Sequence, residues 1–169
     1  MPTPTSPPAL HLDHVVFPVF DAAASFRFYT EVLGLLLMST LEGDDWDGRA
    51  WLMMLFALPD AREIVLVARR GAPRPKNDGV PRDVRHLAFA VSSLAEQAAW
   101  RRRLEEHGLE VRAMDHGPQQ SIYFDDPDGT VLEITTPASK EVMARDPKAE
   151  ASVRAWLAQS LTTNAAPWQ

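Results

Sequence analysis

A short motif occurs twice in the chain, and this repetition restricts the fold more than any other feature of the sequence. Asp-His-Val-Val-Phe-Pro-Val at residues 13–19 corresponds to Arg-His-Leu-Ala-Phe-Ala-Val at residues 85–91. Each copy is followed by a helical pattern and then by a Gly-Leu pair, and the two glycines, Gly34 and Gly108, follow their histidines at nearly the same distance. Internal similarity of this kind predicts two copies of one supersecondary unit.

Both copies show the same predicted order of elements, a strand, a helix and three further strands. A helix is expected between the N-cap Asp21 and Gly34, and another from Ser92 or Ser93 to His107. Strands are expected at residues 12–20, 35–41, 51–58 and 63–68, and then at 84–91, 109–114 and the two sides of a hairpin at 121–134.

Neither copy can bury its sheet face alone, which predicts that the two pack together. We therefore expect an α+β fold in which two βαβββ modules, residues 12–69 and 84–136, pair their curved sheets around a shared cleft. Together they form one domain, residues 11–137, with a Pro- and Gly-rich linker at 70–83.

The two ends of the chain differ from this pattern. Residues 1–10 are rich in proline and are expected to be a disordered tail. Residues 138–169 are expected to form a helical extension, with helices at 140–145 and 149–161 interrupted at Asp146-Pro147. An apolar stripe on the second helix is expected to cover either its own domain or a second subunit.

The composition excludes several classes of partner. The 169 residues carry a formal net charge of −6 and include no cysteine. An acidic chain lacks the positive potential that attracts nucleic acids and anionic membranes. No apolar run approaches the length of a membrane span, and disulfides are ruled out. We expect a cytoplasmic protein that acts on a small molecule, with no nucleic-acid or membrane partner.

Three residues form a candidate metal site. Glu133 places a carboxylate in an otherwise apolar strand, where an unpaired charge is costly and a cation would stabilise it. His14 and His86 occupy the same position in the first strand of each module. Two imidazoles and one carboxylate are the ligands of a facial triad, which leaves positions open for substrate or O₂. Ala88 and Ala90, on the predicted face of His86, are small enough to leave a cavity.

These features resemble the vicinal oxygen chelate superfamily, which includes glyoxalase I, fosfomycin-resistance enzymes, extradiol dioxygenases and bleomycin-binding proteins. The resemblance covers residues 12–136 and implies that His14, His86 and Glu133 are the metal ligands. Glyoxalase I carries a fourth ligand in the last strand of its first module. The position aligned with it here is Leu66, and Glu63 lies near the strand start, so the resemblance implies three ligands.

The second module is similar to that of ring-cleaving dioxygenases in the segments 85–91, 96–101 with Leu104 and Gly108-Leu109, 121–124 and 132–136. This likeness implies an Fe(II), or alternatively Mn(II), enzyme that cleaves a catechol- or hydroquinone-like ring. Tyr123 would reach into the site, and His116 would be a proton shuttle, because histidine exchanges protons near neutral pH.

Two other functions remain open within the superfamily. One is a lyase or isomerase of glyoxalase type, in which Zn(II) or Ni(II) polarises a carbonyl as a Lewis acid. The other is a drug-binding protein, although such relatives generally lack the three ligands. Relatives commonly form dimers, so a homodimer is expected, and in some of them the site is built from two chains.

Overall fold

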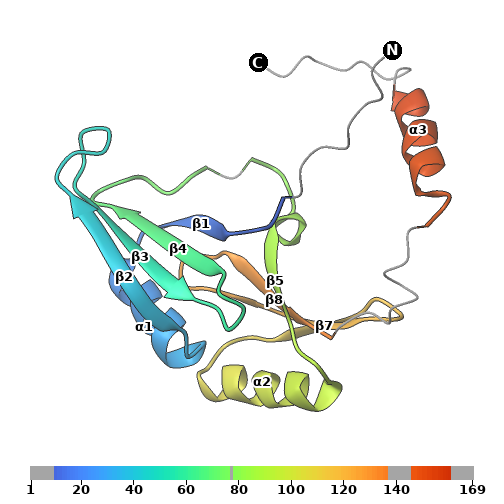
Figure 1. Ribbon diagram of the computed structural model, residues 1–169, viewed down its shortest axis with the longest axis horizontal. Coiled ribbons are helices and arrows are strands. Elements are labelled where there is room, and N and C mark those ends of the chain that lie inside the picture. Colours follow the sequence, from blue (N-terminus) through green and yellow to red (C-terminus); the bar gives the residue numbers. More distant parts are fainter. Residues whose placement is uncertain (1–9, 77, 137–145, 161–169) are drawn as a thin grey trace.

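The computed structural model of the protein describes residues 10–76, 78–136 and 146–160 (Figure 1). The first module contains β1 (His14–Val19), α1 (Ala22–Arg27), η1 (Phe28–Val32), β2 (Leu36–Gly43), β3 (Trp51–Ala57) and β4 (Glu63–Arg69). The second contains η2 (Arg82–Val84), β5 (His86–Ala90), α2 (Leu94–Glu106), β6 (Arg112–Asp115), β7 (Gln120–Asp125) and β8 (Val131–Thr135). A last helix, α3, covers Ala149–Ser160.

The two modules have the same topology, which confirms the predicted α+β fold of two βαβββ modules. Sheet A has the strand order β1-β4-β3-β2, and sheet B has the order β5-β8-β7-β6. In each sheet the first and last strands of the module pair in parallel, and the other pairs are antiparallel. The first strand of each module is therefore an edge strand, and both histidines of the repeat lie on an edge.

The first helix begins and ends where the sequence predicts, but its second half is a π-helix. The side chain of Asp21 accepts a hydrogen bond from the backbone N–H of Ala24, and Gly34 ends the helix with a φ of 70°. Over η1 the backbone N–H of Leu33 donates to the carbonyl of Phe28 at 3.0 Å, five residues back. π-helical turns inside helices often occur at functional sites, but here η1 supplies core residues.

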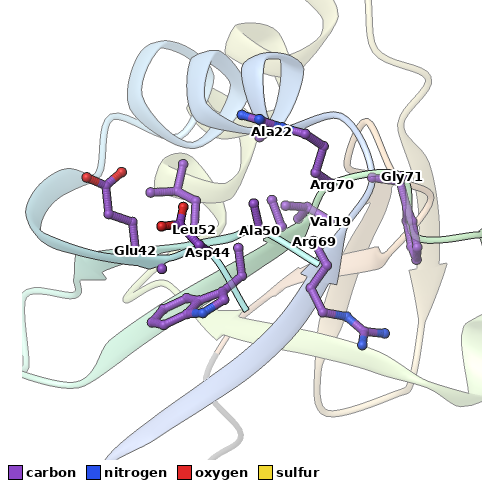
Figure 2. Close-up of a pocket in the computed structure, with 13 residues that line it drawn as sticks. Val19, Ala22, Glu42, Asp44, Ala50, Leu52, Arg69, Arg70 and Gly71 are labelled. Carbon is purple, nitrogen blue, oxygen red and sulfur yellow. The ribbon is translucent and has the colours of Figure 1, made fainter. Parts of the chain in front are cut away.

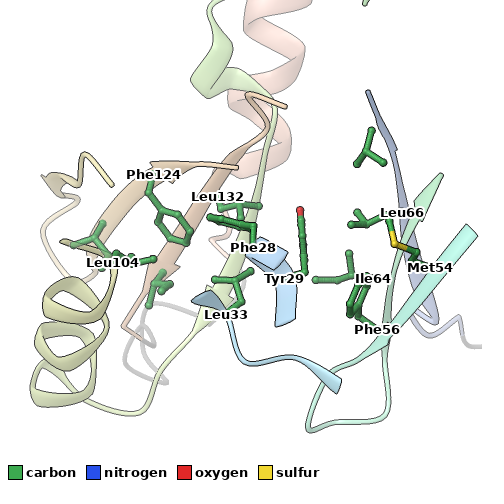
Figure 3. Close-up of a cluster of buried hydrophobic side chains, with 13 residues drawn as sticks. Phe28, Tyr29, Leu33, Met54, Phe56, Ile64, Leu66, Leu104, Phe124 and Leu132 are labelled. Carbon is green, nitrogen blue, oxygen red and sulfur yellow. The ribbon is translucent and has the colours of Figure 1, made fainter. Parts of the chain in front are cut away.

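The α1–η1 helix lies between the two sheets and gives them a common core (Figure 3). The Tyr29 ring contacts Phe56 of sheet A, with centroids 5.6 Å apart, whereas the Phe28 ring lies 6.5 Å from that of Phe124 in sheet B. Side chains alternate along a strand, so each sheet has a core face, turned toward this helix, and an opposite face, which we call its site face. His14 lies on the site face of sheet A and His86 on that of sheet B.

This packing separates the two site faces. The core faces of both sheets meet the same helix, so the site faces point away from the shared core and away from each other. Within one chain the sheets therefore share a core rather than a cleft. The predicted cleft between paired curved sheets remains a prediction.

The turn between β7 and β8 forms hydrogen bonds to residues of the first module. The Asp128 carboxylate accepts hydrogen bonds from the Phe20 backbone N–H at 3.0 Å and from the Ser25 hydroxyl at 2.9 Å, and Arg74 of the linker forms an ion pair with it at 2.8 Å. The hydroxyl of Tyr29 donates to the Asp126 carboxylate at 3.1 Å. Both carboxylates thus have hydrogen-bond or ion-pair partners, as buried polar groups in proteins generally do.

The pKa of Asp126 is raised above its usual 3.8, chiefly because burial disfavours the charged carboxylate. A raised folded-state pKa adds stability below the unfolded-state pKa, and this contribution is lost as the pH rises through the folded-state pKa. Urea unfolding from pH 3 upward is therefore expected to show that wild type loses stability relative to Asp126→Asn as the pH rises. A difference that is constant or grows with pH would contradict this assignment.

The helix of the second module, α2, begins and ends at the predicted residues. Ser93 caps α2 by accepting from the Glu96 backbone N–H, and the Glu96 carboxylate accepts from the Ser92 backbone N–H. His107 is the C-cap. The strand predicted at 109–114 begins later, at Arg112, because the preceding residues pack on the core without pairing to β7.

The C-terminal helix predicted at 149–161 is confirmed as α3, which lies apart from both sheets in Figure 1. Its apolar residues Val153, Trp156 and Leu157 are each more than half exposed. The predicted helix at 140–145 and the predicted tail lie outside the described residues, apart from Leu10. Among the described helices, none is long and apolar enough to cross a membrane.

Candidate metal centre

His86 and Glu133 meet on the site face of sheet B. Strands β5 and β8 are parallel neighbours in which Ala88 pairs with Glu133, so His86 lies one same-face position away. The Nε2 atom of His86 is 2.8 Å from Oε2 of Glu133. Two ligand atoms that each lie about 2.1 Å from one metal ion, at a right angle, are about 3 Å apart. The pair therefore fits two neighbouring positions of a single divalent ion.

The surroundings of the pair support this fit. The other ring nitrogen of His86, Nδ1, lies 2.7 Å from the backbone carbonyl of Asp83, and a carbonyl can only accept. Nδ1 therefore carries the proton, which leaves the lone pair of Nε2 for a metal ion when the ring is neutral. Glu133 is only 6% exposed. A carboxylate buried to this extent needs a cationic partner.

Tyr123 and His116 extend the site along sheet B. Tyr123 pairs with Glu133 in register, and its hydroxyl is 3.0 Å from Nε2 of His116. The Tyr123 ring also meets the His86 ring edge to face, with centroids 5.7 Å apart. Burial, followed by the charge of Glu133, raises the pKa of Tyr123. The phenol therefore stays protonated at neutral pH and can donate a hydrogen bond.

His14 is not part of this cluster. It lies at the edge of sheet A, where its Nδ1 atom is 2.8 Å from the Asp13 carboxylate and its side chain is 47% exposed. In the part of the chain that the structure describes, no group of three or more His, Asp or Glu side chains is close enough to hold one ion. One chain thus brings together four of the five predicted site residues, namely His86, Glu133, Tyr123 and His116.

The residue at the position of the fourth metal ligand of glyoxalase I is not Leu66, as the sequence predicted. Val16 pairs with Val65 just as Ala88 pairs with Glu133, so the counterpart of Glu133 is Val65. Leu66, the position expected from the sequence, lies on the core face and is fully buried. An error of one residue moves a side chain to the other face of a strand. Both residues are apolar, so neither supplies a fourth ligand.

Two further charged residues lie beside predicted site residues, one in each sheet. Glu63 pairs in register with His14, although its place at the strand start argued against it. Arg112 pairs in register with Tyr123, and its guanidinium lies 3.5 Å from the Asp125 carboxylate. The strand register places Glu63 beside His14 on sheet A and Arg112 beside Tyr123 on sheet B. One sequence alone does not specify register between strands distant along the chain.

Comparison with known proteins places the chain in a family. Residues 11–134 match the model of the Glyoxalase/Bleomycin resistance protein/Dioxygenase superfamily. This match spans both modules and includes all five predicted site residues. The chain therefore belongs to this superfamily, as the sequence resemblance implied.

Individual relatives are less than 30% identical to the chain, and the two whose names state an activity differ in it. The chain is 29% identical to the Escherichia coli protein YaeR over 72% of this chain and 92% of that protein. It is 26% identical to the metallothiol transferase FosB of Staphylococcus epidermidis, over 78% and 85% of the two chains. It is 23% identical to the catechol-2,3-dioxygenase of Bacillus subtilis, over 80% of this chain but only 45% of the dioxygenase.

The solved structures support the fold. A glyoxylase/bleomycin resistance protein/dioxygenase domain from Frankia has a TM-score of 0.62 and 24% identity, and the match covers 76% of this chain and 98% of that chain. A likeness at this level of identity concerns the fold alone.

Proposed function

We propose that the protein is a mononuclear metal enzyme whose site is completed between two copies of the chain. His86 and Glu133 of one copy would hold a divalent ion together with His14 of the other. The separation of the site faces supports this arrangement, because one chain turns His14 away from the other two ligands.

The site face of sheet A has the character of a surface that another chain covers. Val16, Leu36 and Leu41 lie on it and are each more than half exposed. Apolar groups exposed together on a sheet are typical of an interaction surface. In a two-fold dimer, sheet A of each copy would face sheet B of the other, which would create two equivalent sites.

The reaction that we propose is the cleavage of a catechol- or hydroquinone-like ring with Fe(II). The observation that carries this proposal is the Tyr123–His116 pair directly beside the His86–Glu133 pair. The iron ion, when bound, would supply the redox chemistry and the binding of vicinal oxygens. Tyr123 would donate a hydrogen bond to a substrate oxygen, and His116, which is exposed, would exchange its proton with solvent.

The charges around the site favour a neutral aromatic substrate over a strongly anionic one. On the site face of sheet B, the guanidinium of Arg112 is already beside the Asp125 carboxylate, which also pairs with Arg82 at 3.0 Å. Ala88 and Ala90 are exposed on the same face as the ligands and make the surface beside them apolar. An aromatic ring suits such a surface.

A redox-neutral reaction is the second candidate, and the similarity to FosB over most of both chains favours it. Zn(II), Ni(II) or Mn(II) would then act as a Lewis acid on a substrate oxygen. The same three ligands and Tyr123 would serve either reaction. A drug-binding role without metal is less consistent with a buried carboxylate beside an imidazole.

Oxygen uptake distinguishes the two candidates. Protein loaded anaerobically with Fe(II) is expected to consume O₂ in the presence of a catechol or hydroquinone, and His86→Ala is expected to abolish the uptake. Absence of uptake across a panel of such substrates, with the metal still bound, would contradict the dioxygenase proposal. A panel of thiols, thiohemiacetals and CoA esters would then test the redox-neutral reaction.

Tyr123→Phe tests the role of the phenol separately from that of the metal. Removing one positioned hydrogen-bond donor is expected to lower kcat about a hundredfold, and to leave the bound metal unchanged. Steady-state kinetics and metal analysis of the same preparation give both values. Tyr29→Phe is the control, because it removes a phenol of the core that hydrogen-bonds to Asp126 and does not contact the His86–Glu133 pair. An unchanged kcat in Tyr123→Phe would remove this residue from the mechanism.

A further inference from the structure

A cavity lies on the core-face side of sheet A, away from the candidate metal centre. It has a volume of about 720 Å³ and is shown in Figure 2. One row of paired residues crosses all four strands to form its floor, in the order Val19, Ala68, Leu52 and Glu42. His14 and Val65 lie on the opposite face of the same sheet. The cavity therefore takes no part in the proposed metal chemistry.

The cavity exists because small residues line the end of the sheet. Ala22 at the start of α1, Ala50 before β3 and Ala68 in β4 all line it, and none has a side chain long enough to fill the space. Its volume is within the range of small-molecule sites in proteins.

The second module shows that the fold itself does not require this cavity. Thr136 and Gln120 occupy the places in sheet B that Ala68 and Leu52 occupy in sheet A. There, the Gln97 side chain of α2 reaches the sheet and donates to the carbonyls of Gln120, at 2.7 Å, and Ile134, at 2.9 Å. The same position is thus closed by a polar side chain in one module and open in the other.

Opposite charges stand at the two sides of the open cavity. Figure 2 shows Glu42 on one side and Arg70 on the other, with Leu52 and Ala50 between them. Asp44 adds a second carboxylate to the lining. Within the described residues, none of these three charged side chains has an ion pair or a side-chain hydrogen bond. They are therefore free to bind a ligand.

We propose that this cavity binds a small zwitterion of the amino-acid type. The ammonium group of the ligand would lie near Glu42 and Asp44, and its carboxylate would pair with the Arg70 guanidinium, which suits carboxylate geometry. The apolar part of the ligand would cover Val19 and Leu52 on the floor. A ligand without a carboxylate would leave Arg70 unpaired, and a ligand without an ammonium group would leave Glu42 and Asp44 unpaired.

Calorimetry with aliphatic L-amino acids and their dipeptides tests this proposal. At least one of them, for example L-leucine, is expected to bind saturably. The methyl ester, which lacks the carboxylate, and 4-methylpentanoate, which lacks the ammonium group, are each expected to bind about tenfold or more weakly, because each loses a charge-assisted hydrogen bond. No binding by any member of the panel, or equal binding of the singly charged analogues, would overturn the proposal.

Variants assign the binding to this cavity. Arg70→Gln and Glu42→Gln are each expected to weaken binding by about tenfold or more. Arg102→Gln and Glu106→Gln, which change exposed residues of α2 distant from the cavity, are matched controls and should bind like wild type. Ala68→Leu is expected to fill the cavity and abolish binding. If the Arg70 and Glu42 variants bind as tightly as their controls, the ligand lies elsewhere and the proposed site is wrong.

Discussion

His86→Ala is expected to lose its divalent metal. The Nε2 atom of His86 and the carboxylate of Glu133 are 2.8 Å apart, so each would supply one bond to the same ion. Loss of a group that only supports a ligand typically weakens metal affinity by about 10- to 100-fold. Loss of a ligand itself should exceed this, and dialysed His86→Ala is expected to retain almost no metal by elemental analysis.

His11→Ala provides the matched control, because it removes an exposed imidazole just before β1 without changing sheet B. It is expected to retain the wild-type metal content. Glu133→Gln should lose metal as His86→Ala does, since the amide keeps the shape of the side chain but not its charge. Full metal content in His86→Ala or in Glu133→Gln would show that the substituted residue is not a metal ligand.

Mixing two inactive variants is expected to restore part of the activity. If each site takes His14 from one copy and His86 with Glu133 from the other, then His14→Ala and His86→Ala are each inactive alone. A mixed dimer, however, has one site with both mutations and one site with neither. After random exchange half of the dimers are mixed, so about a quarter of the sites become intact.

The measurement is activity and metal content after the two variants are co-expressed or are unfolded and refolded together. A mixture of His86→Ala with Glu133→Gln is the control. His86 and Glu133 of each site come from the same chain, so every site of a mixed dimer still carries one of the two substitutions. Recovery in the first mixture alone would establish a site between chains. Activity in neither mixture, with dimers present, would show that His14 does not act across an interface.

Short-range features of the chain were predictable because they depend on neighbouring residues. The side chain of Asp21 caps α1, Gly34 ends the first helix with a positive φ, and Ser93 caps α2. The pairing of Tyr123 with Glu133 follows from a tight turn that joins two alternating strands. In each case the partner groups lie within one hairpin or helical turn, so the pattern of residues contains the whole interaction.

Register between distant strands was harder to predict. The sequence pattern predicts Leu66 at the position of the fourth ligand of glyoxalase I, whereas β1 and β4 pair so that Val65 is the counterpart of Glu133. Valine and leucine are equally apolar, so the sequence pattern does not distinguish the two faces of this buried strand. The later start of β6 has a similar cause, because packing on the core replaced pairing for the residues that precede it.

By itself, the sequence determined the repeated module, the strand face that carries His86 and the grouping of His86, Glu133 and Tyr123 in one sheet. Only the tertiary structure decided how the sheets face, because the α1–η1 helix packs against both of them through Phe28 and Tyr29. This packing buries the core faces together and turns the site faces apart. It follows from contacts between residues far apart in the chain, which no local pattern specifies.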